Sequence, residues 1–600
     1  MTTSSLPFAS FLRVRSANAG VFSPDGRCLA YLMNTPGTPQ VFRQDSPGQS
    51  GVQLTSRDGI ARAIHWSPSG DALAFTMDTG GNEREQIYVM LPDGREQRCV
   101  TDYPEAIHHF GAWSPDGTQI AFVSNRREPA FFDLYVVDVG TGHDRCILQQ
   151  DRYLTVADWS SDGRQLLVRE LLSNSDHNLH VFDLETAALR LVTPHQGDAR
   201  FESAQFLPDN RSVLLCTDQD RDFLALARLD TKLSRLRPLL ERRADVESCE
   251  LTADGKRLVA LLNRDGWSEV VIARLDERIL RGLVSVRLPG VASGCRISAN
   301  GSRIALSLNS PTMNPDVWSM DPETTARTRW TRAPLGGLED LTWVEPKAIQ
   351  YPSYDGLQIP ALLYRPKDAP VGPMPTIVHI HGGPESQDRP NFSPVYQYLA
   401  HRGYTVLAPN VRGSTGYGNA YCHLDDREKR YDALRDVEYA HRWLVSSGNA
   451  ESNRIGIMGA SYGGFTVLAC LTRQPELWAV GVDIVGISNF ETFFQHTGPW
   501  RRHLRAREYG DPVTDVHLLR DLSPIHAVDQ IRAPLMVIQG ANDPRVPQVE
   551  SDQMVAQLRA RNHPVEYLLF PDEGHGIVKL ENRIKAYTAI AELLDQHLLS

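Results

Sequence analysis

The chain has 600 residues, of which 41% are hydrophobic and 22% are charged, a composition typical of a globular protein with large buried cores. Its formal net charge of −11 argues against nucleic acid as a partner, because binding to phosphates requires clustered Lys and Arg. No run of 18 apolar residues occurs, so we expect no transmembrane helix and no membrane partner.

The first residues contain no basic segment followed by a long apolar stretch, so the sequence predicts no secretory signal. Eight cysteines are scattered without C-x-x-C pairs, which in a long chain indicates free thiols rather than disulfides or a zinc site. We therefore expect a cytoplasmic protein that uses no metal and no other cofactor.

A short motif recurs through the first half of the chain at steps of 44 to 47 residues. The four clearest copies are FSPDG, WSPSG, WSPDG and WSSDG, which begin at Phe22, Trp66, Trp113 and Trp159. The three weaker copies are FLPDN, LTADG and ISANG, which begin at Phe206, Leu251 and Ile297. A repeat of this length indicates that one structural unit occurs seven times.

In each copy an apolar residue ends one strand, a Pro-Asp-Gly type turn reverses the chain, and an alternating strand such as TQIAFVS follows. A further strand such as DLYVVDV comes soon afterwards, followed by a polar turn and a last short strand. Four strands per repeat make one blade, so the sequence predicts a seven-bladed β-propeller over residues 22–334. Residues 1–21 form an N-terminal extension that could pack on the second domain.

Residues 335–600 show a different pattern, in which short apolar strands alternate with amphipathic helices. The strand TIVHIHG precedes the helical pattern YQYLAHRG, and the strand RIGIMGAS precedes TVLACLTRQPELW. This alternation predicts a mainly parallel sheet flanked by helices, here an α/β-hydrolase fold. Ligands of such sheets bind beyond the carboxyl ends of the strands, where the motifs below occur.

Residues 459–463 read GASYG, a G-x-S-x-G motif between the strand RIGIM and a helix. In this context the serine occupies a sharp turn that lifts its hydroxyl out of the sheet. Ser461 is therefore the predicted nucleophile of a serine hydrolase. A glycine-rich helix start without chemistry is the alternative.

Two partners follow in the order that this fold uses, because Asp543 comes directly after the strand LMVIQG and His575 comes after VEYLLF. The histidine can take the serine proton as general base, and the aspartate can orient the imidazole. Asp572 and Glu573 are nearer to His575 in sequence. A carboxylate at the end of a strand is held more rigidly, so Asp543 is the predicted acid.

The segment His381-Gly382-Gly383-Pro384 follows the early strand TIVHI. An HGG loop in this place commonly donates one backbone N–H to the oxyanion, and the residue after the nucleophile donates the other. We therefore predict an oxyanion hole made by the amides of Gly383 and Tyr462, with His381 as a structural residue. A plain turn at the strand end is the alternative.

A propeller followed by HGGP, RGSTGYG, GASYGG, GANDPRVP and DEGHG resembles the prolyl oligopeptidase family over essentially the whole chain. The match is closest to its acylaminoacyl-peptidase and dipeptidyl-peptidase-like bacterial branches. The resemblance implies a serine peptidase whose propeller caps the site, admits short peptides and excludes folded proteins.

The resemblance also implies contacts with the substrate. Arg545 would hold the carbonyl of the residue before the cleaved one, with a surface salt bridge as the alternative. The segment DIVGISNFETFFQHTGPWRR resembles the lining of the pocket for the side chain at the scissile bond. It contributes the candidates Ile487, Phe490 and Trp500, for which core packing is an equal alternative.

The chain also departs from parts of the family. Prolyl oligopeptidase proper uses a tyrosine hydroxyl in its oxyanion hole, where HGGP offers a glycine amide. Residues 22–334 contain no Glu-Glu pair of the kind with which the dipeptidyl-peptidase branch reads a free amino terminus. The leading hypothesis is therefore an acylaminoacyl-peptidase that releases N-acylated amino acids from short peptides.

Several alternatives remain. A carboxypeptidase-like member would read a C-terminal carboxylate with Arg501 and Arg502 or with a propeller arginine, and a dipeptidyl peptidase would read the free amino terminus. An esterase or amidase on small substrates is a further enzymatic alternative. A non-catalytic propeller scaffold is disfavoured by the complete triad. The sequence leaves the oligomeric state open, a homo-oligomer included.

Overall fold

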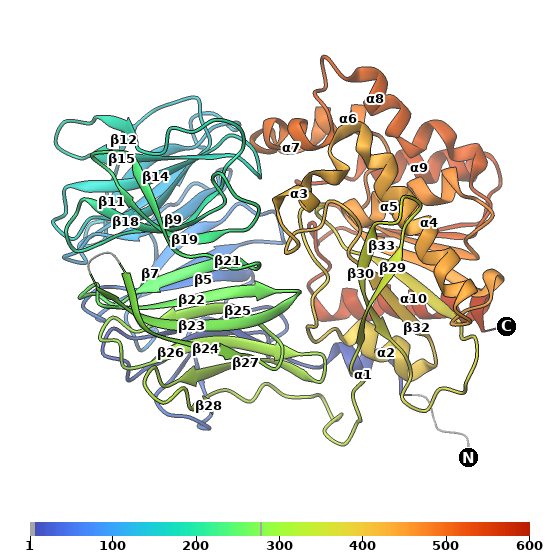
Figure 1. Cartoon of the computed structure of the whole chain (residues 1–600), viewed down its shortest axis with the longest axis horizontal. Helices are drawn as coiled ribbons and strands as arrows, with labels where there is room; N and C mark the ends of the chain where they lie inside the picture. Colours follow the sequence, from blue (N-terminus) through green and yellow to red (C-terminus); the bar gives the residue numbers. More distant parts are fainter. Residues whose placement is uncertain (1–5, 277–278, 600) are drawn as a thin grey trace.

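The computed structural model describes residues 6–276 and 279–599, which form two domains side by side (Figure 1). Seven sheets of four antiparallel strands follow one another along the chain and form the propeller. The predicted architecture, a seven-bladed β-propeller followed by an α/β-hydrolase domain, is confirmed. The first blade begins at Ala17, ahead of the boundary at residue 22 that the repeat suggested.

The strands of the first four blades are β1 (Ala17–Phe22), β2 (Leu29–Met33), β3 (Gln40–Gln44), β4 (Val52–Gln53), β5 (Ile60–Trp66), β6 (Leu73–Asp78), β7 (Gln86–Met90), β8 (Arg98–Cys99), β9 (His108–Trp113), β10 (Gln119–Ser124), β11 (Asp133–Asp138), β12 (Asp144–Leu148), β13 (Leu154–Trp159), β14 (Gln165–Leu171), β15 (His177–Asp183) and β16 (Leu189–Leu191). The strands of the last three blades are β17 (Phe201–Phe206), β18 (Ser212–Thr217), β19 (Ala225–Asp230), β20 (Arg235–Leu240), β21 (Asp245–Leu251), β22 (Arg257–Arg264), β23 (Trp267–Asp276), β24 (Ile279–Arg287), β25 (Val291–Ile297), β26 (Ile304–Ser310), β27 (Met313–Met320) and β28 (Arg327–Arg329).

The repeated motif forms the turn between the first two strands of a blade. In the first copy the Ser23 hydroxyl donates to Asp25 Oδ1 over 2.6 Å, and Gly26 takes a φ of +73°. The third copy repeats the contact between Ser114 and Asp116 at 2.6 Å. The motif recurs because this turn needs a local side-chain acceptor and a residue that tolerates positive φ.

The ring closes without a shared strand, since each blade uses consecutive strands, and hydrogen bonds and apolar packing join the first blade to the last. Asn300 Nδ2 of the seventh blade donates to the Asp25 carbonyl over 2.7 Å, and Gln44 Nε2 of the first donates to the Trp330 carbonyl over 2.7 Å. A shared apolar cluster that includes Phe22 and Trp330 seals the junction.

The hydrolase sheet has the strand order β29-β30-β32-β31-β33-β34-β35-β36. At one edge β29 and β30 pair antiparallel, β30 is also antiparallel to β32, and the pairings from β32 through to β36 are all parallel. The strands are β29 (Lys347–Pro352), β30 (Gln358–Tyr364), β31 (Thr376–Ile380), β32 (Thr405–Pro409), β33 (Ile455–Ala460), β34 (Val480–Ile484), β35 (Leu535–Gly540) and β36 (Val565–Phe570).

The α-helices are α1 (Phe8–Leu12), α2 (Pro394–Arg402), α3 (Asn419–Cys422), α4 (Arg430–Ser446), α5 (Tyr462–Arg473), α6 (Phe490–His496), α7 (Arg502–Tyr509), α8 (Val516–Leu522), α9 (Val549–Ala560) and α10 (Leu580–Leu598). The 3₁₀ segments within the described residues are η1 (His423–Asp425), η2 (Arg427–Lys429), η3 (Ser452–Arg454), η4 (Pro499–Arg501) and η5 (Pro524–Gln530). Helices α4, α5 and α9 cover one face of the sheet, and α1, α2 and α10 cover the other. Successive residues of a strand point to opposite faces of the sheet and so belong to different apolar cores, as Val537 and Met536 do in β35.

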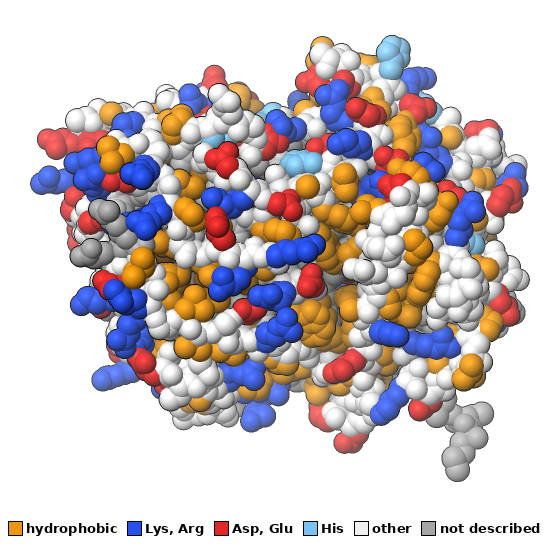
Figure 2. Space-filling view, in the orientation of Figure 1, with side chains coloured by type: hydrophobic (Ala, Val, Ile, Leu, Met, Phe, Trp, Pro, Cys, Tyr) orange, Lys and Arg blue, Asp and Glu red, His pale blue; other side chains and the backbone are white. Residues whose placement is uncertain are grey.

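The N-terminal helix α1 lies against the hydrolase domain, with Phe8 stacked on Tyr398 at a ring distance of 3.8 Å. Among the described residues no helix is long and apolar enough to cross a membrane. On the face shown in Figure 2, acidic and basic side chains are intermixed and do not form a stripe of one sign.

Candidate active site

Ser461 lies between β33 and α5, with φ of +60° and ψ of −120°. Backbone strain in such a conformation costs a non-glycine residue about 1–3 kcal/mol, and the surrounding packing must offset this cost. Its flanking glycines permit that packing. A Cβ on Gly463 would lie 2.2 Å from the Ile380 carbonyl oxygen, and one on Gly459 would lie 2.4 Å from the oxygen of Gly463. The G-x-S-x-G spacing therefore follows from the close approach of strand and helix.

The three side chains that the sequence paired are hydrogen-bonded in a row. The Ser461 hydroxyl lies 3.0 Å from His575 Nε2, and His575 Nδ1 lies 2.7 Å from Asp543 Oδ2. The other oxygen, Asp543 Oδ1, accepts the backbone N–H groups of Arg545 at 2.8 Å and Val546 at 3.0 Å. With its side chain fully buried, the aspartate has a fixed orientation and fixes the proton on His575 Nδ1. The free Nε2 then faces the serine.

The two competing carboxylates have other partners. Asp572 pairs with Lys579 Nζ at 2.8 Å and accepts from Asn582 Nδ2 at 3.0 Å. Glu573 is buried and accepts the backbone N–H groups of Val578 at 3.0 Å and Lys579 at 2.9 Å. Both carboxylates thus hold the loop that carries the histidine, and neither is hydrogen-bonded to the imidazole.

The HGG loop lies directly against the serine, since a Cβ on Gly382 would come within 3.3 Å of Ser461 Cβ. Neither the Gly383 nor the Tyr462 amide donates to any of the residues that the structure describes. Two unoccupied N–H groups beside a serine hydroxyl are suited to stabilise an oxyanion. His381 is hydrogen-bonded to the Ser414 hydroxyl at 2.9 Å and to the Gly382 carbonyl at 2.7 Å, which makes it part of the loop structure.

A propeller loop that sequence reasoning missed lies against the hydrolase loops that carry Asp543 and His575. This loop, residues 79–85, joins β6 to β7. Its Gly80 carbonyl accepts from Asn542 Nδ2 at 3.3 Å, beside the acid. Gly81 contacts Gly574, beside the histidine, so closely that a Cβ on Gly574 would lie 1.9 Å from the Gly81 oxygen. The loop therefore touches the loop after the candidate acid and the loop of the candidate base.

The same loop supplies the partner of Arg545. Arg545 Nε lies 2.6 and 2.9 Å from the two carboxylate oxygens of Glu83. The side chain of Arg545 is 43% exposed and that of Glu83 is 20% exposed, so the pair remains accessible. The structure thus gives Arg545 a salt bridge, but one across the domain interface and next to the triad.

The three pocket candidates lie in different places. Ile487 and Phe490 are buried in the hydrolase core, where Phe490 contacts the rings of Phe465 and Tyr509 at 5.0 Å. They present no surface to a ligand in this structure. Trp500 packs against an apolar cluster of the propeller and lines an interdomain cavity of about 430 Å³. A hydrophobic residue in the sequence does not reveal whether it lines a pocket or lies beneath one.

A buried ionic cluster lies against Tyr462, one of the two candidate oxyanion donors. Arg430 pairs with Asp425 Oδ2 at 2.9 Å and with Glu508, and Asp425 also accepts from the Tyr462 hydroxyl at 3.1 Å. Burial raises the pKa of Asp425 to about 7. Asp425, Asp426 and Glu508 could together hold a metal ion by their spacing, but the Arg430 guanidinium already provides a cation there.

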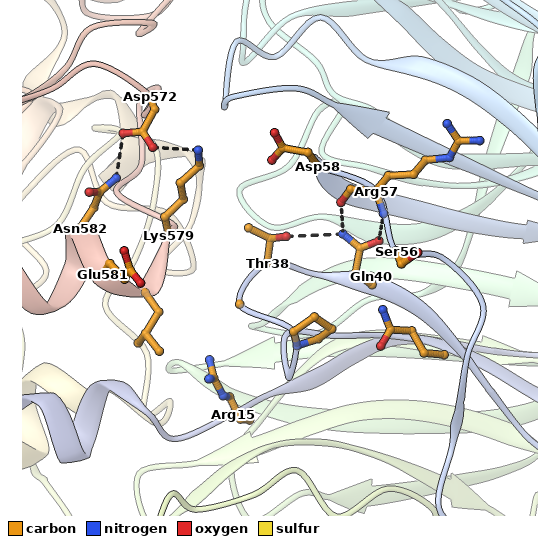
Figure 3. A pocket seen from close by; sticks show the side chains of 14 residues that line it. Arg15, Thr38, Gln40, Ser56, Arg57, Asp58, Asp572, Lys579, Glu581 and Asn582 are labelled. Carbon is orange, nitrogen blue, oxygen red and sulfur yellow. Dashed lines mark hydrogen bonds and ion pairs between the residues drawn. The ribbon is translucent and has the colours of Figure 1, made fainter.

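A separate cavity of about 590 Å³ opens between the first two blades and the loop that carries the histidine (Figure 3). The paired Asp572 and Lys579 form part of its hydrolase wall, and Thr38, Gln40 and Asp58 form part of its propeller wall. None of the triad residues lines this cavity. It lies beside the site and is not the site itself.

Comparison with known proteins shows what the two domains are similar to. Residues 390–600 match the model of the prolyl oligopeptidase family, and residues 17–249 match that of the TolB β-propeller domain. The chain is 30% identical to dipeptidyl aminopeptidase BIII of Pseudoxanthomonas mexicana, over 95% of this chain and 85% of that protein. It is 27% identical to the acylamino-acid-releasing enzyme of Sus scrofa, over 92% of this chain and 89% of that protein. A crystal structure of puromycin hydrolase matches the fold with a TM-score of 0.87 at 20% identity, over 99% of this chain and 98% of that one.

Proposed function

The chain belongs to the prolyl oligopeptidase family and is a serine peptidase, and on that premise we propose that it releases N-acylated amino acids from short peptides. In the proposed mechanism Ser461 is the nucleophile, His575 the general base and Asp543 the orienting acid. The amides of Gly383 and Tyr462 stabilise the oxyanion. His575 then returns the proton to the leaving amine, and water hydrolyses the acyl-enzyme by the same route.

The observation that supports a preference for acylated substrates is the contact between Arg545 and Glu83. Glu83 is the propeller carboxylate in contact with Arg545, next to the triad, and both its oxygens lie within 2.9 Å of Arg545 Nε. Its charge is therefore already balanced, and a positively charged amino terminus would gain little from it. An acylated terminus carries no charge and needs no such partner.

A second candidate is a dipeptidyl aminopeptidase, which the similarity to dipeptidyl aminopeptidase BIII favours. If Arg545 turned to a substrate carbonyl, Glu83 would lose its partner and could bind the α-ammonium group of a free amino terminus. The two candidates differ in the charge of the terminus, so they can be separated with two substrates.

The test compares kcat/KM for acetyl-Ala-p-nitroanilide and for Ala-Ala-p-nitroanilide, with Ser461→Ala as the inactive control. The proposal expects the acetylated substrate to be cleaved more efficiently, and expects a fluorophosphonate probe to label wild type but not Ser461→Ala. Preference for the free dipeptide, lost in Glu83→Gln, would contradict it and establish the second candidate.

A further inference from the structure

Three arginines converge on the candidate active site from the hydrolase domain, and two of them have carboxylate partners. Arg545 pairs with Glu83, and Arg505 Nη1 lies 2.8 Å from Glu385 Oε2. The third, Arg501, has no hydrogen bond or ion pair through its side chain to any of the described residues. Its Nε is buried without a partner, and the side chain as a whole is half-buried.

The position of Arg501 is fixed by the triad loops. It ends η4, whose start is anchored to the loop after the acid: Gly498 N–H donates to the Pro544 carbonyl over 2.9 Å, and the Thr497 hydroxyl donates to the Arg545 carbonyl over 2.8 Å. One helical turn later Arg505 lies against the oxyanion loop, 3.4 Å from the Gly383 oxygen. Arg501 thus lies on an element that joins the acid loop to the oxyanion loop.

The nearby charges do not balance the positive charge of Arg501. Burial, and then the neighbouring Arg505 and Arg545, lower the pKa of Arg501 to about 10, while Glu83 acts in the other direction. A guanidinium of this pKa is still charged at neutral pH. A partly buried charge without a counter-ion is costly, and proteins tend to pair such groups with a side chain, a metal or a ligand. Since Glu83 and Glu385 already serve Arg545 and Arg505, a ligand is the remaining source of an anion.

We propose that Arg501 binds a carboxylate group of the peptide substrate, so that the enzyme prefers acidic over neutral substrates. This rests on the proposed function, in which Ser461 cleaves short acylated peptides. The carboxylate has two sources, an acidic side chain at the scissile residue or the C-terminus of a short peptide. A guanidinium recognises both in the same way, with two parallel N–H groups.

Two substrate pairs distinguish the sources. The first pair is acetyl-Glu-p-nitroanilide and acetyl-Gln-p-nitroanilide, which differ in the side-chain charge. The second pair is acetyl-Ala-Ala with a free and with an amidated C-terminus. The measured quantity is the ratio of kcat/KM within each pair, for wild type, Arg501→Gln, Arg501→Lys and the control Arg502→Gln. The sequence offered Arg502 together with Arg501 as a reader of a C-terminal carboxylate, but in the structure Arg502 is exposed and donates to the Gln495 carbonyl over 2.7 Å. Its variant therefore removes one positive charge next to the site and leaves the unpartnered guanidinium of Arg501 in place.

We expect wild type to favour the carboxylate member of one pair by about tenfold or more, as a charge-assisted contact does. Arg501→Gln should bring that ratio close to one, Arg501→Lys should retain part of it, and Arg502→Gln should keep the wild-type ratio. The pair that responds identifies the source. Fluorophosphonate labelling of each variant reports whether its active site is intact. If Arg501→Gln fails to fold, the kcat/KM ratios of Arg501→Lys are compared with those of wild type instead.

The inference is overturned if wild type shows no preference in either pair, or if its preference is the same in Arg501→Gln or is equally lost in Arg502→Gln. In those cases neutral acetylated substrates are still cleaved, so the proposed function stands without it. If wild type cleaves no acetylated substrate and is not labelled, the proposed function fails and the inference fails with it.

Discussion

The replacement of Arg545 by alanine tests whether this hydrolase-domain arginine, which is paired with a propeller carboxylate, binds the substrate. We propose that Arg545 binds the carbonyl of the substrate residue before the cleaved one, a charge-assisted hydrogen bond that contributes about 1.5–3 kcal/mol. In the structure the same guanidinium is paired with Glu83 through Nε, which leaves its terminal Nη groups for the carbonyl. The pair with Glu83 is therefore kept when the carbonyl binds, and a pair with this exposure contributes only about 0.2–1 kcal/mol.

The carbonyl contact sets the expected magnitude. Its loss of about 1.5–3 kcal/mol corresponds to a decrease of roughly 10- to 150-fold in kcat/KM for Arg545→Ala on acetylated peptides. The assay is steady-state hydrolysis of an acetyl-dipeptide p-nitroanilide, which has the preceding carbonyl. On p-nitrophenyl acetate, which lacks it, the loss should be markedly smaller.

The matched variant is Glu83→Gln, which removes the charge that holds Arg545 Nε and keeps the shape of the side chain. It should change kcat/KM for acetylated peptides by no more than about 5-fold, because only the contribution of an exposed ion pair is lost. Equal losses of Arg545→Ala on peptide and on ester would refute the reasoning, since the arginine would then act by supporting the Asp543 loop. No loss on either substrate would make it a surface residue.

The remaining predictions concern the triad, the ionic cluster and the propeller. Asp543→Asn should lower kcat by about 10⁴-fold, whereas Asp572→Asn should be mild; the reverse order in steady-state kinetics would mean that the acid is misassigned. Arg430→Ala leaves the buried carboxylates without their cation and should lower the free energy of unfolding by about 3–5 kcal/mol in urea titrations; an unchanged midpoint would contradict this. Acetylated peptides should be cleaved while unfolded casein survives at the same concentration of active sites, and rapid degradation of casein would show that the propeller does not restrict access.

The features that the sequence predicted are those with a local cause. The propeller repeat is visible because the turn at Ser23, Asp25 and Gly26 is formed by neighbouring side chains and one positive φ. The triad candidates are visible for a similar reason, because Ser461 and Asp543 each follow a strand end in a short motif. Such features depend on the residues next to them in the chain and hardly on the rest of the fold.

The features that sequence reasoning missed depend on long-range contacts. Glu83 lies 462 residues from Arg545 in the chain, in a loop with no motif of its own. The burial of Phe490 follows from the helices that cover it, and the same residue type at a pocket wall would look identical in the sequence. The lack of a partner for Arg501 is a property of the assembled site. No local pattern encodes any of these three facts.

The distribution of charge suggests that the propeller does more than restrict access. Glu83 from the propeller balances Arg545, and Asn174 Nδ2 from the propeller donates to Glu385 Oε1 over 2.7 Å while Glu385 balances Arg505. Separation of the domains would remove both propeller groups at once. The hydrolase domain would then keep Arg545 without its propeller partner, close to Arg501, which has no side-chain partner among the described residues. If Arg501 binds a substrate carboxylate as we propose, the preference for acidic over neutral substrates requires the closed arrangement of the two domains.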